Sequence, residues 1–356
     1  MSLHRLTFKL TVAVVAGTDP DVYEQYYTGV GNAATAQHRL LETGGYRDGK
    51  RALLPAPVAQ YRIWREERTM DEAAIGIIGG SGLYQIEEMT EVRETRMATP
   101  FGSPSDAVIT GRLEGTRVAF LPRHGRGHRL NPSEVPYRAN IYALKVLGVD
   151  RIISINAVGS LRQDIAPMDI VIPDQLIDRT KLRPSTFFER GVVAHVAFAE
   201  PFCAELRRVA QLAAESTGAK VHFGGTYVVM EGPQFSTRAE SELYRSWNAD
   251  IVGMTALPEA KLAREAEMCY AGVAFVTDYD CWHPEHESVT TEMILKALIG
   301  GVDAARRIVR SAVRDMPERR DCACIRSLAN AIVTPSHLIP EETRRALEPI
   351  AGRYFA

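Results

Sequence analysis

Two carboxylates two residues apart, Asp278 and Asp280, are the side chains of this 356-residue chain best placed to do chemistry. They directly follow the apolar run 271–276, which is typical of a buried strand. A strand that ends in paired acids places charge at the carboxyl edge of a sheet, where open α/β sheets bind ligands. Such a pair can accept hydrogen bonds from an amino group and share a proton with a ring nitrogen. A solvated turn gives the same pattern, so the interpretation depends on the rest of the chain.

Polar or glycine-rich segments also follow other apolar runs. Residues 79–83 read Gly-Gly-Ser-Gly-Leu, a turn whose N–H groups can surround an anion while Ser81 adds a hydroxyl. Arg123 and His124 open a segment with two arginines and two histidines in residues 123–128, and Arg binds phosphate oxygens through paired hydrogen bonds. The residues that end further runs are Asn156, Ala157, Glu231, Phe235, Met254 and Thr255. Each segment alone is as typical of a tight turn or surface loop as it is of a ligand-binding site. Their repetition at strand ends predicts one ligand-binding edge.

The elements that position these residues lie between residues 74 and 316, where apolar runs alternate with amphipathic stretches. The predicted strands cover residues 75–78, 117–121, 151–155, 169–172, 226–230, 251–254 and 272–276. The predicted helices cover residues 137–147, 204–217, 238–247, 258–266 and 291–313. Strands that alternate with helices predict an α/β fold, with a mixed central sheet flanked by helices on both faces.

The chain divides into a leader (residues 1–73), a catalytic domain (74–316) and a C-terminal extension (317–356). The leader carries a strand-like run and a possible helix, but its pattern predicts no role. The extension holds one or two short helices, such as 340–351, and the pair Cys322 and Cys324. One Cys-x-Cys supplies only two ligands and no second pair is near in sequence, so we expect no zinc site. The pair is predicted to be plain thiols or a reducible disulfide, far from the other motifs.

Composition excludes several classes of function. The chain is 46% hydrophobic and 24% charged, as is ordinary for a globular protein, and its net charge of −2 gives no electrostatic case for nucleic acid or anionic membrane. No apolar stretch is long enough to span a bilayer, and the short run 10–17 lacks the cleavage site of a signal peptide. Five cysteines do not make a disulfide scaffold. A cytoplasmic enzyme is the expectation.

In their order and spacing, these motifs resemble the 5′-methylthioadenosine phosphorylases of the trimeric purine nucleoside phosphorylase family. The resemblance covers about residues 74–316, whereas the leader matches nothing in that family and the tail resembles the extension of some microbial members. It is carried by residues 79–83, 99–106, 123–125, 137–141, 230–240, 250–255 and 277–282. The resemblance implies a purine nucleoside phosphorylase-like fold, a homotrimer, and phosphorolysis of 5′-methylthioadenosine to adenine and 5-methylthioribose 1-phosphate. Inorganic phosphate is then a co-substrate, and no metal or cofactor is needed.

The resemblance also implies roles for single residues. Phosphate is expected on Ser81, Arg123, His124, Asn156, Ala157 and Thr255. The ribose is expected on Met254, and the base near Phe235, read by Asp278 and Asp280. The methylthio group is expected near Thr291, Ile294 and Leu295, with His195 from a neighbouring subunit. Ser81 and Asn156 stand where relatives often have Thr, and Thr291 where an aliphatic residue is expected.

The chemistry of phosphorolysis fits these residues. Breaking the C1′–N9 bond develops positive charge on the sugar and negative charge on the purine, so the enzyme must orient phosphate and protonate N7. Asp278 is the candidate acid, with a pKa raised by burial or by Asp280, which would orient it or accept from the N6 amino group. An enzyme for 6-oxopurines would be better served by an amide than by Asp278. A nucleoside hydrolase needs no phosphate site, so Arg123 and His124 argue against it. A non-catalytic binding protein would be expected to have lost Asp278 or Arg123.

Overall fold

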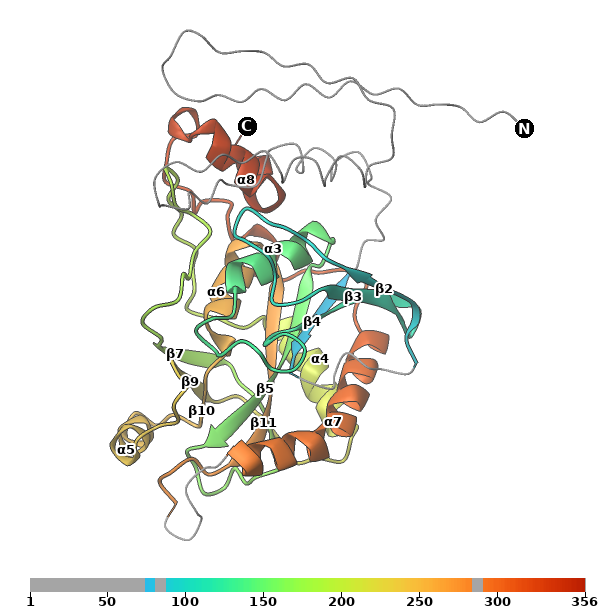
Figure 1. Cartoon of the computed structure of the whole chain (residues 1–356), viewed down its shortest axis with the longest axis vertical. Helices are drawn as coiled ribbons and strands as arrows, with labels where there is room; N and C mark the ends of the chain where they lie inside the picture. Colours follow the sequence, from blue (N-terminus) through green and yellow to red (C-terminus); the bar gives the residue numbers. More distant parts are fainter. Residues whose placement is uncertain (1–73, 81–87, 284–290, 356) are drawn as a thin grey trace, which may run out of the picture. The chain divides into compact units, whose positions relative to one another are not determined.

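The computed structural model describes residues 74–80, 88–283 and 291–355, with the backbone alone for residues 291–299. Its described strands form one mixed 11-stranded sheet (Figure 1). The strands are β1 (Ile75–Gly79), β2 (Thr90–Thr95), β3 (Val108–Leu113), β4 (Thr116–Pro122), β5 (Arg151–Ser160), β6 (Ile170–Ile172), β7 (Gln175–Arg179), β8 (Val221–Phe223), β9 (Thr226–Met230), β10 (Ile251–Gly253) and β11 (Cys269–Asp278). The helices are α3 (Tyr137–Val146), α4 (Ala204–Glu215), α5 (Arg238–Ser246), α6 (Ala256–Glu265), α7 (Thr291–Arg314) and α8 (Glu341–Ala351).

The centre of the sheet is parallel. β1 lies between β4 and β5, and β11 pairs with β5 along nearly its whole length, from Cys269 opposite Arg151 to Val276 opposite Val158. These strands are covered on both faces, which explains why their sequences are almost continuously apolar. All five residues of β1, for example, are buried. The predicted mixed α/β sheet is confirmed.

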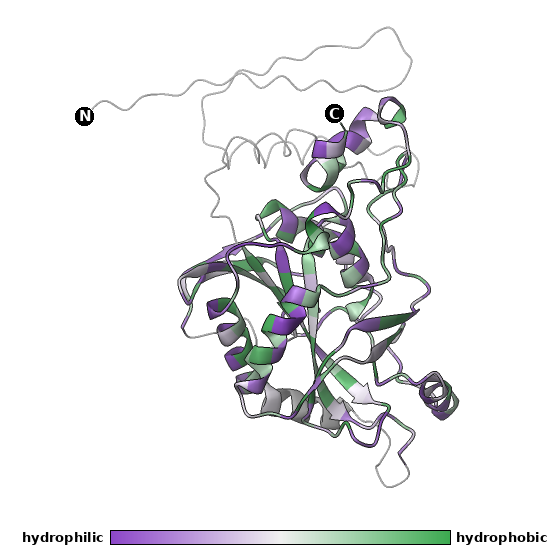
Figure 2. Ribbon diagram, turned by 180° about the vertical axis from the view of Figure 1, so that it is seen from behind, coloured by the Kyte–Doolittle hydropathy of each residue, from purple (hydrophilic) through white to green (hydrophobic). Residues whose placement is uncertain are grey.

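Helices cover both faces of this sheet (Figures 1 and 2). α4 and α7 pack together and against β11 and β5 on one face, while α6 packs on β5 and β11 on the other face, with α3 and α8 beside it. Each layer encloses its own apolar cluster, because side chains along a strand alternate between the two faces. Thus Ile78 lies in the cluster below α3 and α6, and Ile77 in the cluster below α4 and α7.

The predicted elements within the described residues are confirmed, and four strands were missed. Thr237 is the N-cap of α5, and it forms a reciprocal capping box with Glu240. β2 was missed because it is a polar edge strand that is exposed along most of its length. β3, β7 and β8 were also missed. The strand-like run and the possible helix of the leader, at residues 8–16 and 32–43, lie outside the described residues.

The described part of the C-terminal extension packs onto the apolar cluster below α3 and α6. After the short 3₁₀ helices η1 (Ala323–Arg326) and η2 (Ser336–Leu338), α8 lies against α3, and η3 (Gly352–Tyr354) follows α8. The apolar residues of the extension that join the cluster below α3 and α6 are Leu328, Ala331, Ile339, Leu347, Ile350, Ala351 and Phe355. Among the described helices, none is both long and apolar enough to cross a bilayer.

Candidate active site

The predicted site residues converge on β5, at the point where this strand changes neighbours. β1 pairs with β5 only as far as Ser154, whereas β10 pairs with it in antiparallel fashion at Gly159 and Ser160. Open α/β sheets bind ligands beside strand ends, at points where the strand order changes. The expectation that every contributing strand ends at one edge is wrong. β9 and β10 run against β5, so the chain after β10 returns toward the middle of β5 and brings Thr255 to Asn156.

Arg123, which follows β4, lies at the centre of a buried polar network. Its Nε and Nη2 atoms lie 2.6 and 3.1 Å from the two carboxylate oxygens of Glu259 on α6. Nη1 donates to the carbonyl oxygen of Ile155 at 2.9 Å, and Nη2 also donates to the hydroxyl of Ser154 at 2.6 Å. The hydroxyl of Tyr270 donates to Glu259 at 2.9 Å. A buried ion pair is stable only when hydrogen bonds satisfy both partners in this way. The two nitrogens of Arg123 that were expected to bind phosphate, Nε and Nη2, therefore face the carboxylate of Glu259 instead.

The network continues from Ser154 to two predicted phosphate residues. Ser154 Oγ lies 3.2 Å from Asn156 Oδ1, and Asn156 Nδ2 donates to Thr255 Oγ1 at 2.9 Å. Ser154 and Asn156 share one face of β5, because side chains two residues apart along a strand point the same way. Since the Thr255 oxygen accepts from Asn156, its hydroxyl proton can be donated elsewhere. Asn156 and Thr255 are thus brought together, with half-buried Ala157 next to them.

The orientation of His124 settles which of its ring nitrogens carries the proton. Nδ1 lies 2.8 Å from the carbonyl oxygen of Leu130, and a carbonyl can only accept, so Nδ1 is the protonated atom. Burial, with the charge of Arg123, lowers the pKa of His124 to about 4. The ring, which stacks on His128 at a centroid distance of 4.2 Å, is therefore neutral at pH 7. Its Nε2 atom is then an acceptor.

Asp278, the last residue of β11, is buried with 6% of its surface exposed. Its Oδ1 accepts from the N–H of Asp280 at 2.7 Å, and its Oδ2 lies 2.7 Å from the Thr277 hydroxyl. Burial raises the pKa of Asp278, and the charge of Asp280 adds to this, against the hydrogen bonds. Thr277 Oγ1 also lies 3.2 Å from the carbonyl oxygen of Val158. When the single Thr277 proton is donated to Val158, Asp278 Oδ2 can itself carry a proton.

Asp280 lies beside Asp278 and Gly159. It adopts a left-handed backbone (φ 50°), is 5% exposed, and burial raises its pKa. Gly159 on β5 makes room for both acids. A Cβ atom at Gly159 would lie 2.9 Å from Asp278 Oδ1 and 3.3 Å from Asp280 Cβ. The predicted pair of acids is therefore one packed unit at the end of β11.

Met254 is held by Arg183, a residue that sequence analysis missed. The buried Arg183 guanidinium donates to the carbonyl oxygen of Met254, to that of Leu257 at 2.8 Å, and to the carboxylate of Glu231 at 3.1 Å. Gly232, with φ +70°, covers the thioether, since a Cβ atom there would lie 2.5 Å from Met254 Sδ. Arg183 thus fixes the backbone on which the ribose is expected.

The remaining predicted residues are not brought into contact with this group. Phe235 is 40% exposed in the loop after β9. His195 is exposed, and its backbone N–H donates to the carbonyl oxygen of Ala331 in the extension at 2.8 Å. Ser81 and the side chains of Thr291, Ile294 and Leu295 lie outside the described residues.

Some of the missed residues left a signal in the sequence. Ser154 interrupts an apolar strand two residues before Asn156, which makes a short polar stripe on one face. Glu259 is an acid within a largely apolar helix, and it is fully buried. Tyr270 and Arg183 gave no signal, because their partners are distant in sequence.

The family model described as the phosphorylase superfamily matches residues 74–314. The S-methyl-5′-thioadenosine phosphorylase of Chloroflexus aurantiacus is 60% identical over 288 residues, which cover 81% of this chain and 100% of that protein. The protein of the same name from Geobacter sulfurreducens is 56% identical over 284 residues, covering 80% and 99% of the two chains.

Two solved structures agree with this result. A methylthioadenosine phosphorylase from an antarctic soil metagenomic library superposes with a TM-score of 0.76 at 50% identity, over 79% of this chain and 99% of that one. The methylthioadenosine phosphorylase of Schistosoma mansoni, solved in complex with adenine, gives a TM-score of 0.65 at 40% identity, over 68% and 91%.

Proposed function

Since this chain belongs to the phosphorylase superfamily, we propose that it cleaves 5′-methylthioadenosine with inorganic phosphate, giving adenine and 5-methylthioribose 1-phosphate. A phosphate oxygen forms the new bond to C1′ while the C1′–N9 bond breaks. The electron pair of that bond passes into the purine, and a proton is delivered to N7. The names of the relatives and the adenine and methylthioadenosine complexes among the similar structures support this reaction.

One observation carries the proposal: a buried carboxyl group of raised pKa, Asp278, ends β11 beside Gly159, where β5 changes its pairing partner to β10. A carboxyl group whose pKa is raised by burial holds its proton more firmly and can donate it to a ring nitrogen as negative charge develops there. Asp278 is the proposed acid toward N7, through Oδ2. Asp280, whose backbone N–H orients Asp278, is proposed to accept from the N6 amino group.

The phosphate site is proposed to combine donors with one acceptor. Thr255 offers its hydroxyl proton and Asn156 its second amide proton, while neutral His124 offers the Nε2 lone pair. A phosphate that still carries one proton can donate it to His124 and accept from the other two. Arg123 orients this group through Ser154, and its charge is shared with Glu259. Ser81 and Ala157 complete the predicted site.

The sugar is proposed to lie on Met254, whose backbone carbonyl is fixed by Arg183. Phe235 is proposed to cover the base. Ile294 and Leu295, with His195 of a second copy of the chain, are proposed to enclose the methylthio group in a homotrimer. The exposure of His195 is compatible with such a contact.

The experiment is to incubate the purified protein with 5′-methylthioadenosine, adenosine and 5′-methylthioinosine, each with and without phosphate, and to quantify the released base. Adenine release from methylthioadenosine that depends on phosphate is the expected result. Release at the same rate without phosphate would identify a hydrolase. Faster cleavage of methylthioinosine would move the specificity to 6-oxopurines and remove Asp278 from base recognition.

A further inference from the structure

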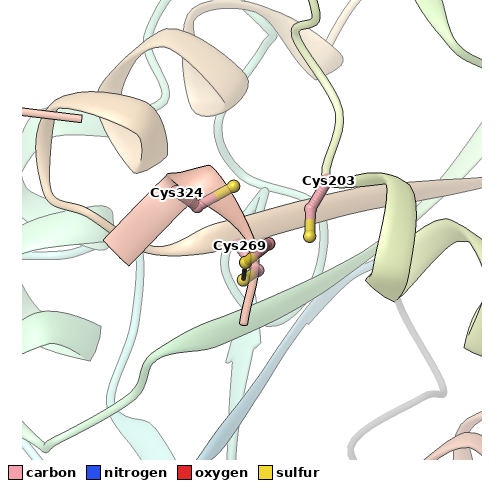
Figure 3. A group of neighbouring side chains, drawn as sticks. Cys203, Cys269 and Cys324 are labelled. Carbon is pink, nitrogen blue, oxygen red and sulfur yellow. Dashed lines mark hydrogen bonds between the residues drawn. The ribbon is translucent and has the colours of Figure 1, made fainter. Parts of the chain in front are cut away.

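Four cysteines meet at the opposite end of β11 from the paired acids. The Sγ atoms of Cys203, Cys269, Cys322 and Cys324 all lie within 4.8 Å of one another, and those of Cys269 and Cys322 are 3.3 Å apart. We call these residues the four-cysteine cluster. Figure 3 shows Cys203, Cys269 and Cys324, with a dashed line at Cys269 that marks its contact with Cys322.

The cluster joins three separate segments. Cys203 directly precedes α4, Cys269 begins β11, and Cys322 and Cys324 lie at η1 of the C-terminal extension. The expectation that only Cys322 and Cys324 could serve as metal ligands here is wrong. The fold places Cys203 and Cys269, which are distant in sequence, beside them. Cys269 precedes Cys322 by 53 residues, a separation that no local motif reveals.

We propose that the four-cysteine cluster binds one zinc ion in a tetrahedral structural site. Four thiolates around zinc at about 2.3 Å require sulfur–sulfur distances of about 3.8 Å. The observed spacing, from 3.3 Å to at most 4.8 Å, brackets this value without movement of the backbone. The donors are four sulfurs, which suit zinc and not magnesium or calcium. With four protein ligands the shell is closed, so the site would not activate water.

The surroundings suit a charged metal–thiolate group. Cys203, Cys269 and Cys324 are buried and Cys322 is half-buried, so the site is sheltered from water. Zinc with four thiolates carries two negative charges, and Arg320 Nη1 lies 3.9 Å from Cys269 Sγ to offset them.

The position of Cys203 also favours a thiolate. Cys203 stands at the N-cap of α4, where the helix dipole favours a negative sulfur.

Disulfides are the other use of neighbouring thiols. A disulfide joins two sulfurs at about 2.05 Å and leaves others outside that bond. Here each of the four sulfurs lies within 4.8 Å of the three others. This arrangement favours a shared central ion over two separate bonds.

The consequence is a clamp on the C-terminal extension. One ion would fasten the extension to the start of β11 and to the start of α4. Asp278 lies nine residues along β11 from Cys269, about 30 Å at the rise of a strand. We therefore expect the metal to act on thermal stability and not on the cleavage step.

The test measures metal in the full-length protein, purified under reducing conditions without a metal-affinity step. Elemental analysis should find about one zinc per chain, as a closed four-ligand site requires. The double variant Cys322→Ser/Cys324→Ser should lose the zinc and melt at a lower temperature. Cys281→Ser removes the fifth cysteine, which lies outside the cluster, and should keep the zinc.

If the double variant fails to fold, a second measurement on the wild-type protein tests the proposal instead. Zinc is released from the wild-type protein with a mercurial reagent, the reagent is removed with excess thiol, and cobalt is added. The intense visible absorption of tetrahedral cobalt thiolates, lost on adding zinc, supports the proposal. If the four cysteines titrate as thiols but bind neither zinc nor cobalt, the proposal is overturned. Mass spectrometry of protein that was purified under reducing conditions and then alkylated gives the other contrary result, which is a disulfide among these four cysteines.

Discussion

The protonation state of Asp278 decides which reaction the candidate site can perform, since a carboxylic acid donates to N7 and a carboxylate does not. Burial and the neighbouring Asp280 both raise its pKa, while Thr277 and the Asp280 N–H act against this. The group is active when protonated. The rate of cleavage should therefore fall as the pH rises through the raised pKa of Asp278.

Asp278→Asn tests this role directly. The amide cannot give up a proton, so turnover of 5′-methylthioadenosine should fall by roughly 10²-fold or more, as for loss of a general acid. The fall in rate at high pH should disappear with it, and relative activity on 6-oxopurine nucleosides should rise. Asp280→Asn is the control that should keep the high-pH limb. An adenine preference unchanged in Asp278→Asn would rule out its role in reading the base.

Arg123 and Glu259 must be substituted both singly and together, because removing either side chain leaves the other as an unpaired buried charge. Arg123→Met and Glu259→Met should each cost about 3–5 kcal/mol of unfolding free energy. The double variant, apolar on both sides, should regain much of that loss in urea unfolding, since it leaves no buried charge. The KM of the double variant for phosphate should nevertheless stay above that of the wild-type protein, as in the Arg123→Met variant. If the phosphate kinetics recovered together with stability, Arg123 would be only a scaffold residue.

The residues of this site were predictable to different degrees. Asp278, Arg123 and Thr255 follow apolar runs, so the sequence indicated that they lie at strand ends. Their partners were hidden, because a contact such as Arg123 with Glu259 joins residues 136 positions apart. The tautomer of His124 was also out of reach, since it depends on a carbonyl group in a turn.

At the scale of elements, β5 and β11 do most to shape the site. The central strands were predictable because burial on both faces makes them continuously apolar. Their directions were not, and the antiparallel β10 decides that Thr255 meets Asn156. The break in register between Val276 and Asp278 likewise has no counterpart in the apolar pattern.

Gly159→Ala tests the packing of β5 against the acids. The new methyl group would lie 2.9 Å from Asp278 Oδ1, so it should displace the carboxylate and lower kcat by at least tenfold. Gly272→Ala is the matched control on β11, because its Cβ meets neighbours only at 3.5 Å, an ordinary contact. Steady-state kinetics and thermal melting of both variants give the result. Equal kcat values in the two variants would show that Gly159 does not position Asp278.

At the scale of the whole molecule, the C-terminal extension supports the segment that carries His195. Ala194 forms an antiparallel bridge with Ile332, and the Val193 N–H donates to the Thr334 hydroxyl at 2.9 Å. The extension therefore presents His195 at the surface, where a second copy of the chain can meet it.

His195→Ala tests the proposed pocket for the methylthio group. Burying that group is worth about 1–3 kcal/mol, so the wild-type protein should prefer methylthioadenosine to adenosine by about 10–200-fold in kcat/KM. The variant should lose part of this preference, and light scattering should find a trimer in both proteins. His337→Ala, at an exposed histidine of η2, should change neither. Adenosine cleaved as well as methylthioadenosine by the wild-type protein would count against the pocket.

Phosphorus NMR of a single reaction mixture tests the central claim most directly. With methylthioadenosine and phosphate present, the inorganic phosphate signal should fall as a sugar 1-phosphate signal grows, one molecule for each adenine released. Adenine that accumulates while the inorganic phosphate signal stays constant would contradict phosphorolysis.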